Sequence, residues 1–342
     1  MPQFFSCDWG TSSFRLRHVN AETGEVIAEQ RSASGVRELV ANVAAGDVAR
    51  REAVFADFLR SQLQLLASGD TTSLDGADLI ISGMATSSIG WRELPYAGLP
   101  MALDGSSLVH AGFELKIDAR AQVNVRLVSG VSSADDMMRG EETELIGVFA
   151  AGRYPQVAED GLVLLPGTHS KHVRLQQRQV TSLQTFMTGE LFEVLAAHSV
   201  LRSSVQTSDG APGSTLLERD ARDAFAAGVR ESSDRGLARG LFQTRVRTVL
   251  QAATPVSNGW FLSGLLIGSE VTDVSGLEAT VPILLAAAEP MSAAYQLAFE
   301  TLGLEKRLVA VPPMEMALAS VRGHLALRRS FGRFAVSTRA PQ

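Results

Sequence analysis

The chain has 342 residues, of which 45% are hydrophobic and 20% are charged, and its formal net charge is −6 at pH 7. Chains of this length and composition usually fold as one or two soluble globular domains. The acidic balance argues against a nucleic-acid groove, because phosphate binding along such a groove needs clustered Lys and Arg. No run approaches about 18 uninterrupted apolar residues, so we expect no membrane span.

Cys7 is the only cysteine, so no intrachain disulfide can form. It lies within an apolar run, where a small buried residue is a simpler interpretation than a catalytic thiol. The N-terminal residues show no basic region followed by an apolar stretch and a cleavage site, so we expect no leader peptide. These features favour a cytoplasmic protein.

The first 35 residues predict a three-stranded meander. The runs QFFSCDW and FRLRHV flank a Gly-Thr-Ser-Ser turn, and VIAEQRSA follows a second turn. Apolar side chains at helical spacing predict an amphipathic helix over 47–67. A buried strand at 77–85, a loop at 86–105, a strand at 125–131 and a helix within 135–152 follow. A meander followed by alternating helices and strands favours an open mixed sheet.

The same pattern restarts at residue 161. GLVLLPGTHSKHVRL is again an apolar strand, a Gly-Thr turn with a serine, and a second alternating strand. A strand over 180–188 and a helix over 189–201 follow, as they do in the first half. Because the whole order recurs, and not one motif alone, the sequence predicts two related domains that face each other.

The remaining residues predict mostly helices with three short strands. In chain order we expect helices at 214–231 and 236–253, a strand at 259–264, a helix from 265, a strand within 279–287, a helix at 290–303, a strand at 306–311 and a helix at 312–327. A strand that ends in Ser-Gly before a helix permits flat contact with a ring. Gly264 and Gly268 leave no side chain in the way.

The two Gly-Thr turns are the first candidates for a functional site. Backbone amides and small hydroxyls at a tight turn form a concave donor surface that suits phosphate oxygens. Asp8 stands beside the first turn and suits hydrated Mg²⁺, which takes one or two carboxylates plus phosphate oxygens. The second turn has Lys171 in place of a carboxylate, which suits phosphate charge. Each turn alone could equally be an ordinary hairpin turn, and Lys171 a solvated strand residue.

Two further segments, 132–144 and 185–195, carry candidate residues. In SSADDMMRGEETE, Asp135 or Asp136 reads either as a helix cap or as the general base that accepts a hydroxyl proton in phosphoryl transfer. Arg139 suits a substrate carboxylate, or pairs with Glu142 three residues on. Glu190 suits sugar hydroxyls, or only favours the start of a helix.

Several of these segments together resemble the 2-dehydro-3-deoxygalactonokinase family, within the superfamily of actin, sugar kinases and heat-shock chaperones. They are DWGTSSFR, DDMMRGEETELIG, LPGTHSKHV, TFMTGELFEVLAAHSVL and FLSGLLIGSE, between residue 4 and about 290. The resemblance implies an α/β fold of two actin-like (ribonuclease H-like) domains, 1–152 and 153–342, each a mixed β-sheet with flanking helices. ATP would lie in a cleft between them, and the last helix could pack back on the first lobe. The sequence contains no P-loop or Rossmann motif, so we expect any nucleotide phosphates to be held in another way.

The resemblance also implies a reaction and its residues. ATP and Mg²⁺ would phosphorylate the 6-hydroxyl of 2-dehydro-3-deoxy-D-galactonate in galactonate catabolism, with Asp136 as the catalytic base and Asp135 as its competitor. Arg139 and Arg92 are our candidates for the carboxylate of the sugar acid. The other implied contacts are Asp8 for the metal, Gly10, Thr11, Ser12, Gly167, Thr168, Ser170 and Lys171 for phosphates, Glu190 for the sugar, and Gly264 and Leu265 for adenine.

Two other functions stay open from the sequence. One is a kinase for another sugar or sugar acid on the same fold, and the other is a non-catalytic regulator that senses sugars. A regulator would usually carry a DNA-binding helix pair or a basic tail. The C-terminal segment departs from the family pattern, because Gly323-His324-Leu325 replaces the expected Gly-Leu pair. We expect a small sugar acid as the partner, no nucleic acid and no membrane, and we leave a homodimer open.

Overall fold

The computed structural model describes residues 3–206, 216, 218–274 and 276–332. These residues group into two units, of which the first holds 3–153 together with 317–332. The second unit holds the residues between 154 and 316. The lobe boundary drawn from the sequence at residue 152 stays a prediction, and the segment after 316 groups with the first unit.

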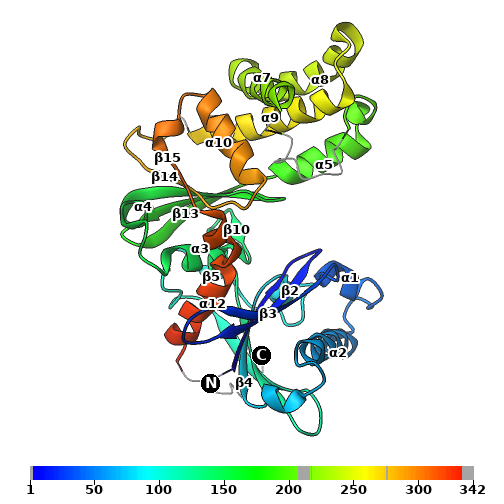
Figure 1. Ribbon diagram of the computed structural model, residues 1–342, viewed down its shortest axis with the longest axis vertical. Helices are drawn as coiled ribbons and strands as arrows, with labels where there is room; N and C mark the ends of the chain where they lie inside the picture. Colours follow the sequence, from blue (N-terminus) through cyan, green and yellow to red (C-terminus); the bar gives the residue numbers. More distant parts are fainter. Residues whose placement is uncertain (1–2, 207–215, 217, 275, 333–342) are drawn as a thin grey trace. The chain divides into compact units, whose positions relative to one another are not determined.

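A six-stranded sheet forms the centre of the first unit. Its strands are β1 (Gln3–Trp9), β2 (Phe14–Asn20), β3 (Val26–Ser32), β4 (Ala77–Gly83), β7 (His110–Lys116) and β8 (Gln122–Val128). Their order is β3-β2-β1-β4-β8-β7. Figure 1 labels β2, β3 and β4 of this sheet. β1, β2 and β3 form the predicted antiparallel meander, and β4 and β8 run parallel to β1. β7 was not predicted, because its half-exposed side chains at the sheet edge give no apolar run.

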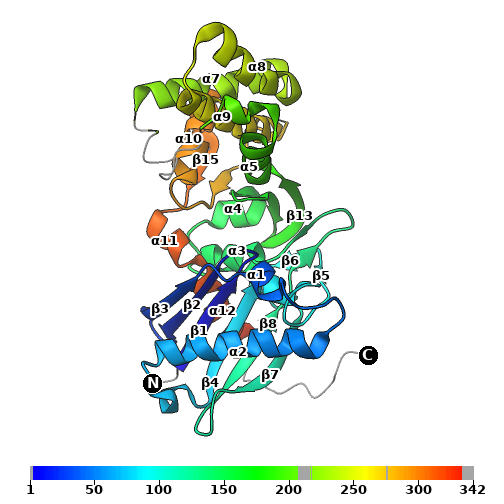
Figure 2. The same cartoon turned by 90° about the vertical axis from the view of Figure 1, so that its right-hand side faces the viewer.

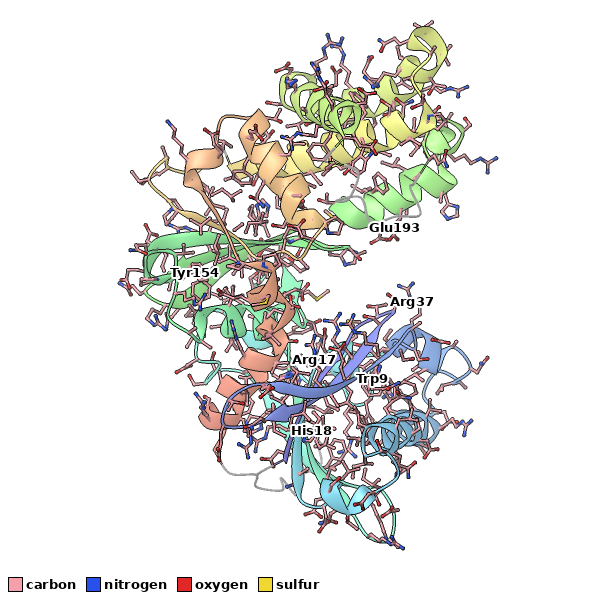
Figure 3. The ribbon with its side chains drawn as sticks, in the orientation of Figure 1. Trp9, Arg17, His18, Arg37, Tyr154 and Glu193 are labelled. Atoms are coloured by element: carbon pink, nitrogen blue, oxygen red, sulfur yellow. The ribbon has the colours of Figure 1, made fainter. Side chains whose placement is uncertain are left out.

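The predicted amphipathic helix is α2 (Val48–Leu66), which lies across one face of this sheet (Figure 2). Successive side chains of a strand point to opposite faces. Cys7 and Trp9 of β1 therefore join the core beneath α2, where Figure 3 labels Trp9. The ring of Trp9 lies 5.1 Å from that of Phe55. Ser6 and Asp8 point to the other face, so the carboxylate of Asp8 lies away from this core.

Two helices, α3 (Glu141–Phe149) and α12 (Ala319–Ser330), cross in close contact within the first unit. A Cβ atom on Gly147 would lie 1.8 Å from the carbonyl oxygen of Ala319. A Cβ atom on Gly323 would lie 2.0 Å from the carbonyl oxygen of Thr143. Any larger residue at either glycine would separate the two backbones, so Gly323 is required by helix packing.

His324 of α12 holds this helix to the central strands. Its Nδ1 atom lies 2.7 Å from the hydroxyl of Ser6 in β1, and its Nε2 atom lies 3.0 Å from the hydroxyl of Ser82 in β4. The imidazole is fully buried. Because a neutral imidazole offers one donor and one acceptor, both ring nitrogens are satisfied here without a charge.

The second unit repeats the same sheet topology. Its strands are β11 (Gly161–Leu165), β12 (Ser170–Gln176), β13 (Gln179–Phe186), β14 (Ile283–Leu285) and β15 (Leu308–Ala310). β12 is antiparallel to both β11 and β13, whereas β14 and β15 continue the sheet parallel to β11. Each unit thus starts with an antiparallel meander whose first strand pairs with a parallel strand. This duplicated ribonuclease H-like topology confirms the predicted actin-like α/β fold.

Helices form a thick layer on the second sheet. They are α5 (Thr188–His198), α7 (Arg219–Arg235), α8 (Leu237–Gln251), α9 (Pro255–Val274) and α10 (Met291–Thr301). The strand predicted at 259–264 is wrong, because these residues form the middle of α9. A short apolar run fits a buried helix as well as a strand, and here tertiary packing against α7 decides for the helix.

The remaining elements are short and connect the larger ones. They are α1 (Val36–Val40), η1 (Thr71–Leu74), η2 (Met84–Thr86), β5 (Ala97–Gly98), β6 (Met101–Ala102), β9 (Val131–Ser132), β10 (Met137–Met138), α4 (Pro155–Asp160), η3 (Val200–Ser203), η4 (Glu305–Arg307) and α11 (Pro313–Ala317). The helix predicted over 312–327 is divided into α11 and α12. Among the described residues, no helix is both long and apolar enough to cross a membrane.

Candidate active site

The first Gly-Thr turn connects β1 to β2 and is bonded to the start of α1. The amide of Gly10 donates to the carbonyl oxygen of Ser13 at 2.8 Å, which closes the turn. The carbonyl oxygen of Thr11 accepts from the amide of Arg37 at 3.1 Å. A Cβ atom on Gly35 would lie 2.3 Å from the carbonyl oxygen of Thr11. The turn therefore keeps its shape only because Gly35 has no side chain.

The second Gly-Thr turn connects β11 to β12 and is bonded to the start of α5 in the same way. The amide of Gly167 donates to the hydroxyl of Ser170 at 3.4 Å. The carbonyl oxygen of Thr168 accepts from the amide of Glu190 at 3.0 Å. A Cβ atom on Gly189 would lie 2.7 Å from the carbonyl oxygen of Gly167. Gly189 is thus required here for the close approach of helix and turn.

Both turns expose backbone donors. Each turn has two successive amides that donate to no acceptor within the described residues, in contrast to the amides of Gly10 and Gly167, which close their turns. Unbonded amides and small hydroxyls at a turn suit phosphate oxygens. The available donors are the amides of Thr11, Ser12, Thr168 and His169, with the hydroxyls of the same threonines and serine.

Ser170 and Lys171 were expected to contact phosphates, but their side chains lie in the interior of the second unit. Their side chains are almost fully buried, with exposed fractions of 1% and 5%. The hydroxyl of Ser170 lies 3.0 Å from that of Tyr295, and the ammonium group of Lys171 donates to the hydroxyl of Thr185 at 2.8 Å. This burial argues against direct contact of either side chain with phosphate. Ser170 instead supports the turn from below.

Asp8 of β1 and Glu144 of α3 are both half-buried in the first unit. Burial raises the pKa of Asp8, although Arg15 and Arg17 oppose the shift. Burial, followed by the charge of Asp8, raises the pKa of Glu144 to about 8. The charges of the two carboxyl groups therefore oppose each other, and the pKa of each is held above its ordinary value. Glu144 was not singled out from the sequence, because the influence of Asp8 on it depends on how α3 packs.

Asp135 and Asp136 lie in the turn between β9 and β10, and not at the start of a helix as predicted. The hydroxyl of Ser133 accepts from the amide of Asp136 at 2.9 Å. The same hydroxyl donates to the carboxylate of Asp135 at 2.8 Å. The helix-cap interpretation of these residues is wrong, since α3 begins five residues later, at Glu141. Their catalytic role stays a prediction.

Arg139 and Arg92 have different surroundings in the first unit. Arg139 donates to the carbonyl oxygen of Thr86 at 2.7 Å, and its guanidinium group lies 4.1 Å above the ring of Tyr96. No carboxylate among the described residues forms an ion pair with it, so the predicted pair with Glu142 is absent. Arg92, by contrast, pairs with Glu52 at 2.9 Å. The charge of Arg139 is therefore better placed to meet an anionic ligand.

Glu190 lies in the first turn of α5, and its carboxylate lies 2.5 Å from Nε2 of His169. Both residues are solvent-accessible in this unit. His169 thus provides a partner that the sequence alone did not connect to Glu190. The proposed contact of Glu190 with sugar hydroxyls stays a prediction.

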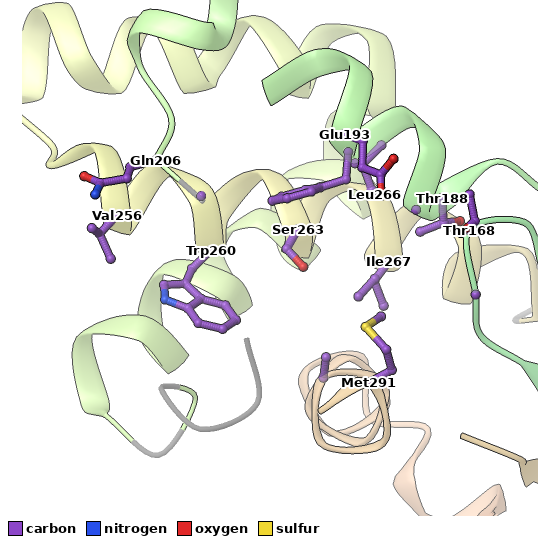
Figure 4. A pocket seen from close by; sticks show the side chains of 15 residues that line it. Thr168, Thr188, Glu193, Gln206, Val256, Trp260, Ser263, Leu266, Ile267 and Met291 are labelled. Atoms are coloured by element: carbon purple, nitrogen blue, oxygen red, sulfur yellow. The ribbon is translucent and has the colours of Figure 1, made fainter. Parts of the chain in front are cut away.

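A cavity of about 350 Å³ lies within the second unit, between α5, α9 and the start of α10 (Figure 4). Apolar side chains form most of its walls, and the turn residues Gly167 and Thr168 form one end. This volume is at the lower limit of small-molecule pockets, and such pockets are mostly apolar with a few polar groups. The other lining residues are Thr188, Gly189, Phe192, Glu193, Gln206, Val256, Gly259, Trp260, Ser263, Leu266, Ile267, Met291 and Ala294.

Gly264 and Leu265, expected beside adenine, do not line this cavity. A Cβ atom on Gly264 would lie 2.0 Å from the carbonyl oxygen of Phe225, so this glycine lets α9 touch α7. Leu265 is fully buried. Ser263 and Leu266 face the cavity instead, because neighbouring residues of a helix point in different directions. Their helical spacing is a signal that could have identified this face, had the segment been assigned as a helix.

Comparisons with known proteins agree with one another. The family described as 2-keto-3-deoxy-galactonokinase matches residues 8–321. A protein of Rhizobium meliloti (strain 1021), named as a probable 2-dehydro-3-deoxygalactonokinase, is 32% identical over 90% of this chain and 92% of its own. The 2-dehydro-3-deoxygalactonokinase of Escherichia coli (strain K12) is 31% identical over 68% of this chain and 73% of its own.

A solved structure gives the same result. The crystal structure of a candidate 2-dehydro-3-deoxygalactonokinase from Sinorhizobium meliloti has 31% sequence identity to this chain and a TM-score of 0.74. The match covers 95% of this chain and 98% of that one. The similarity to this structure, in sequence and in architecture, therefore extends over almost the whole chain.

Proposed function

The chain belongs to the 2-keto-3-deoxy-galactonokinase family, and on that premise we propose the reaction that it catalyses. It transfers the γ-phosphate of ATP to the 6-hydroxyl of 2-dehydro-3-deoxy-D-galactonate, a step of galactonate catabolism. The family match and the two relatives confirm the family that the sequence motifs predicted. They also confirm the class of enzyme, a phosphotransferase with an alcohol group as acceptor.

One observation supports a nucleotide site in the second unit. The apolar cavity ends at Gly167 and Thr168, and the amides of Thr168 and His169 in this turn are available to an anion. A nucleotide has the same division into an apolar ring and charged phosphates. We therefore assign the base to the walls around Trp260 and Ser263, and the phosphates to the turn at Thr168.

The first unit offers matching donors for phosphate at Thr11 and Ser12, with Asp8 beside them. Mg²⁺ keeps several water ligands and binds proteins through one or two carboxylates together with phosphate oxygens. Asp8 and Glu144 fit such an ion, whose charge would also favour their ionised forms. No group of three or more metal-ligating side chains occurs among the described residues. When bound, Mg²⁺ would neutralise charge on the phosphates.

The sugar acid is assigned to Arg139, which carries a charge without a carboxylate partner in the described part of the chain. Thr86 and Tyr96 orient its guanidinium group, and a guanidinium group binds a carboxylate through two parallel hydrogen bonds. Asp136 takes the proton of the 6-hydroxyl as it attacks the γ-phosphate, with Asp135 as the alternative base. Positioning and charge stabilisation supply most of the rate. A cytoplasmic location and a homodimer stay predictions.

A coupled assay of ADP release tests this function. ATP, Mg²⁺ and a panel of acceptors are supplied, namely 2-dehydro-3-deoxy-D-galactonate, its D-gluconate epimer, D-galactonate and the neutral sugar D-galactose. We expect ADP release that depends on the first acceptor, and a product with phosphate at oxygen 6 by NMR. ADP release without any acceptor, or equal rates with galactose, would contradict the proposal.

A further inference from the structure

The buried carboxylate of Glu270 in α9 is hydrogen-bonded to residues behind the polar end of the nucleotide cavity. Its exposed fraction is 2%. The hydroxyl of Tyr295 in α10 donates to Oε2 at 2.7 Å, and Nε2 of His172 in β12 lies 3.0 Å from Oε1. The hydroxyl of Thr188, the first residue of α5, also donates to Oε2. Three helices and one strand therefore meet at this group.

The hydrogen bonds from the turn to Glu270 have a defined direction. Tyr295 donates its only hydroxyl proton to Glu270, so its oxygen must accept from Ser170, which lies 3.0 Å away. The oxygen of Ser170 in turn accepts from the amide of Gly167 at 3.4 Å. A continuous chain thus leads from the backbone of the second turn to the buried carboxylate.

Burial keeps this chain intact. The side chains of Ser170 and Tyr295 are 1% and 0% exposed, so water does not compete for their hydrogen bonds. Burial, followed by the charge of Glu270, raises the pKa of Tyr295 well above its ordinary value, and the hydroxyl keeps its proton. Hydrogen bonds that are mutually polarised in a poorly solvated interior are stronger than isolated ones.

A second connection reaches the same carboxylate from α5. Thr188 lines the cavity, and the next residue is Gly189, which lies against the carbonyl oxygen of Gly167. The two elements that form the polar end of the cavity, the turn and the start of α5, are therefore both attached to Glu270.

We propose that Glu270 is a positioning residue for the nucleotide, which holds the turn at Gly167 and Thr168 in the shape that receives phosphate. The inference rests on the proposed function, since the phosphates are those of ATP. Glu270 itself contacts neither the ligand nor the reacting atoms. It acts through Tyr295 and Ser170 on one side and through Thr188 on the other.

The test compares binding of ADP with binding of adenosine, by calorimetry, in the full chain. Y295F removes one hydroxyl from the chain of hydrogen bonds and leaves the cavity walls unchanged. We expect the dissociation constant for ADP to rise roughly tenfold, the effect of one lost charge-assisted hydrogen bond. The constant for adenosine should stay within about twofold, because the cavity for the base is intact.

A second variant and a double variant separate positioning from general damage. S170A should weaken ADP binding by the same factor, and S170A/Y295F should be no weaker than either single variant, since both remove the same chain. T244V is the matched control, because Thr244 is a fully buried residue of α8 whose hydroxyl has no partner among the described residues. It should bind ADP and adenosine like the wild type.

The possible results are distinct. Equal loss of ADP and adenosine, or ADP binding by both single variants that equals the wild type, would overturn the positioning role. If Y295F does not fold, S170A gives the answer alone, again from the ratio of the two constants. A wild-type protein that binds neither ADP nor ATP would instead contradict the proposed function.

Discussion

The backbone amide of Glu190 donates a hydrogen bond to the carbonyl oxygen of Thr168 at 3.0 Å, which joins the first turn of α5 to the second hairpin turn. The amide of Arg37 makes the same kind of bond to Thr11 at 3.1 Å in the first unit. The duplication seen in the sequence therefore extends to how each turn is supported. In both units a helix start holds a turn that exposes amides.

The glycine beneath each turn should be essential for ATP binding. In G189A the new methyl group would lie 2.7 Å from the carbonyl oxygen of Gly167, and in G35A it would lie 2.3 Å from that of Thr11. The turn must shift, and we expect the KM for ATP to rise about tenfold or more in steady-state assays. G98A is the control, because a Cβ atom there meets nothing within 4 Å. Wild-type kinetics in G189A and G35A would show that these turns do not hold phosphate.

Two neighbouring residues of α9 should respond differently to substitution. S263L places a large side chain in the cavity, and we expect nucleotide affinity to fall more than tenfold with little change in the melting temperature. G264A instead places a methyl group 2.0 Å from the carbonyl oxygen of Phe225. It should destabilise the fold by about 1–3 kcal/mol, as other overpacked sites do. Calorimetry for binding and denaturant titration for stability distinguish the two, and a selective loss of nucleotide in G264A would restore its predicted place beside adenine.

Arg139 should select acceptors that carry a carboxylate. R139Q removes a charge that no described carboxylate neutralises, so the KM for the sugar acid should rise on the order of 10- to 100-fold, with a smaller effect on the KM for ATP. R92Q provides the comparison, because Arg92 already pairs with Glu52. A larger increase in R92Q than in R139Q would exchange the roles of the two arginines.

The identity of the general base can be tested with two conservative substitutions. D136N keeps the shape of the turn after β9 but cannot accept a proton, and we expect kcat to fall roughly 100-fold or more. D135N, one residue earlier and more exposed, should keep most of its activity. The reverse result would assign the proton transfer to Asp135.

Stability should fall in acid because of His324. Burial, and then the charge of Arg17, lowers the pKa of His324 to about 3 in the folded state, from its ordinary value of 6.5. The unfolded chain takes up the proton first, so this stabilisation is complete above pH 6.5 and is lost as the pH falls from 6.5 towards 3. Between pH 7 and pH 5 the free energy of unfolding should drop by about 2 kcal/mol more in the wild type than in H324Q.

Denaturant titrations at several pH values give this difference. The comparison with H324Q is needed because Glu142, whose pKa is raised to about 8 chiefly by burial, acts in the opposite direction. Its stabilisation is complete below its ordinary pKa and is lost as the pH rises towards 8. Parallel curves for the wild type and H324Q would show that His324 is not buried in its neutral form.

The sequence alone was sufficient for features that depend on neighbours along the chain. Alternating side chains predicted the meander of β1, β2 and β3, and helical spacing predicted α2, because both patterns are local. The repeated strand-turn-strand order predicted two related units, and the motifs around both turns predicted the family. None of these inferences required a contact between distant residues.

The tertiary structure decided the features that depend on packing between distant segments. A six-residue apolar run at 259–264 fits either a strand or a helix, and contact with α7 makes it part of α9. In this helix Ser263 faces the cavity and Gly264 does not. Glu270 lies 100 residues from Ser170, and only the fold connects the buried carboxylate to the turn. Local propensity carries no information about such contacts, because their free energy comes from burial and hydrogen bonding that exist only once the chain has folded.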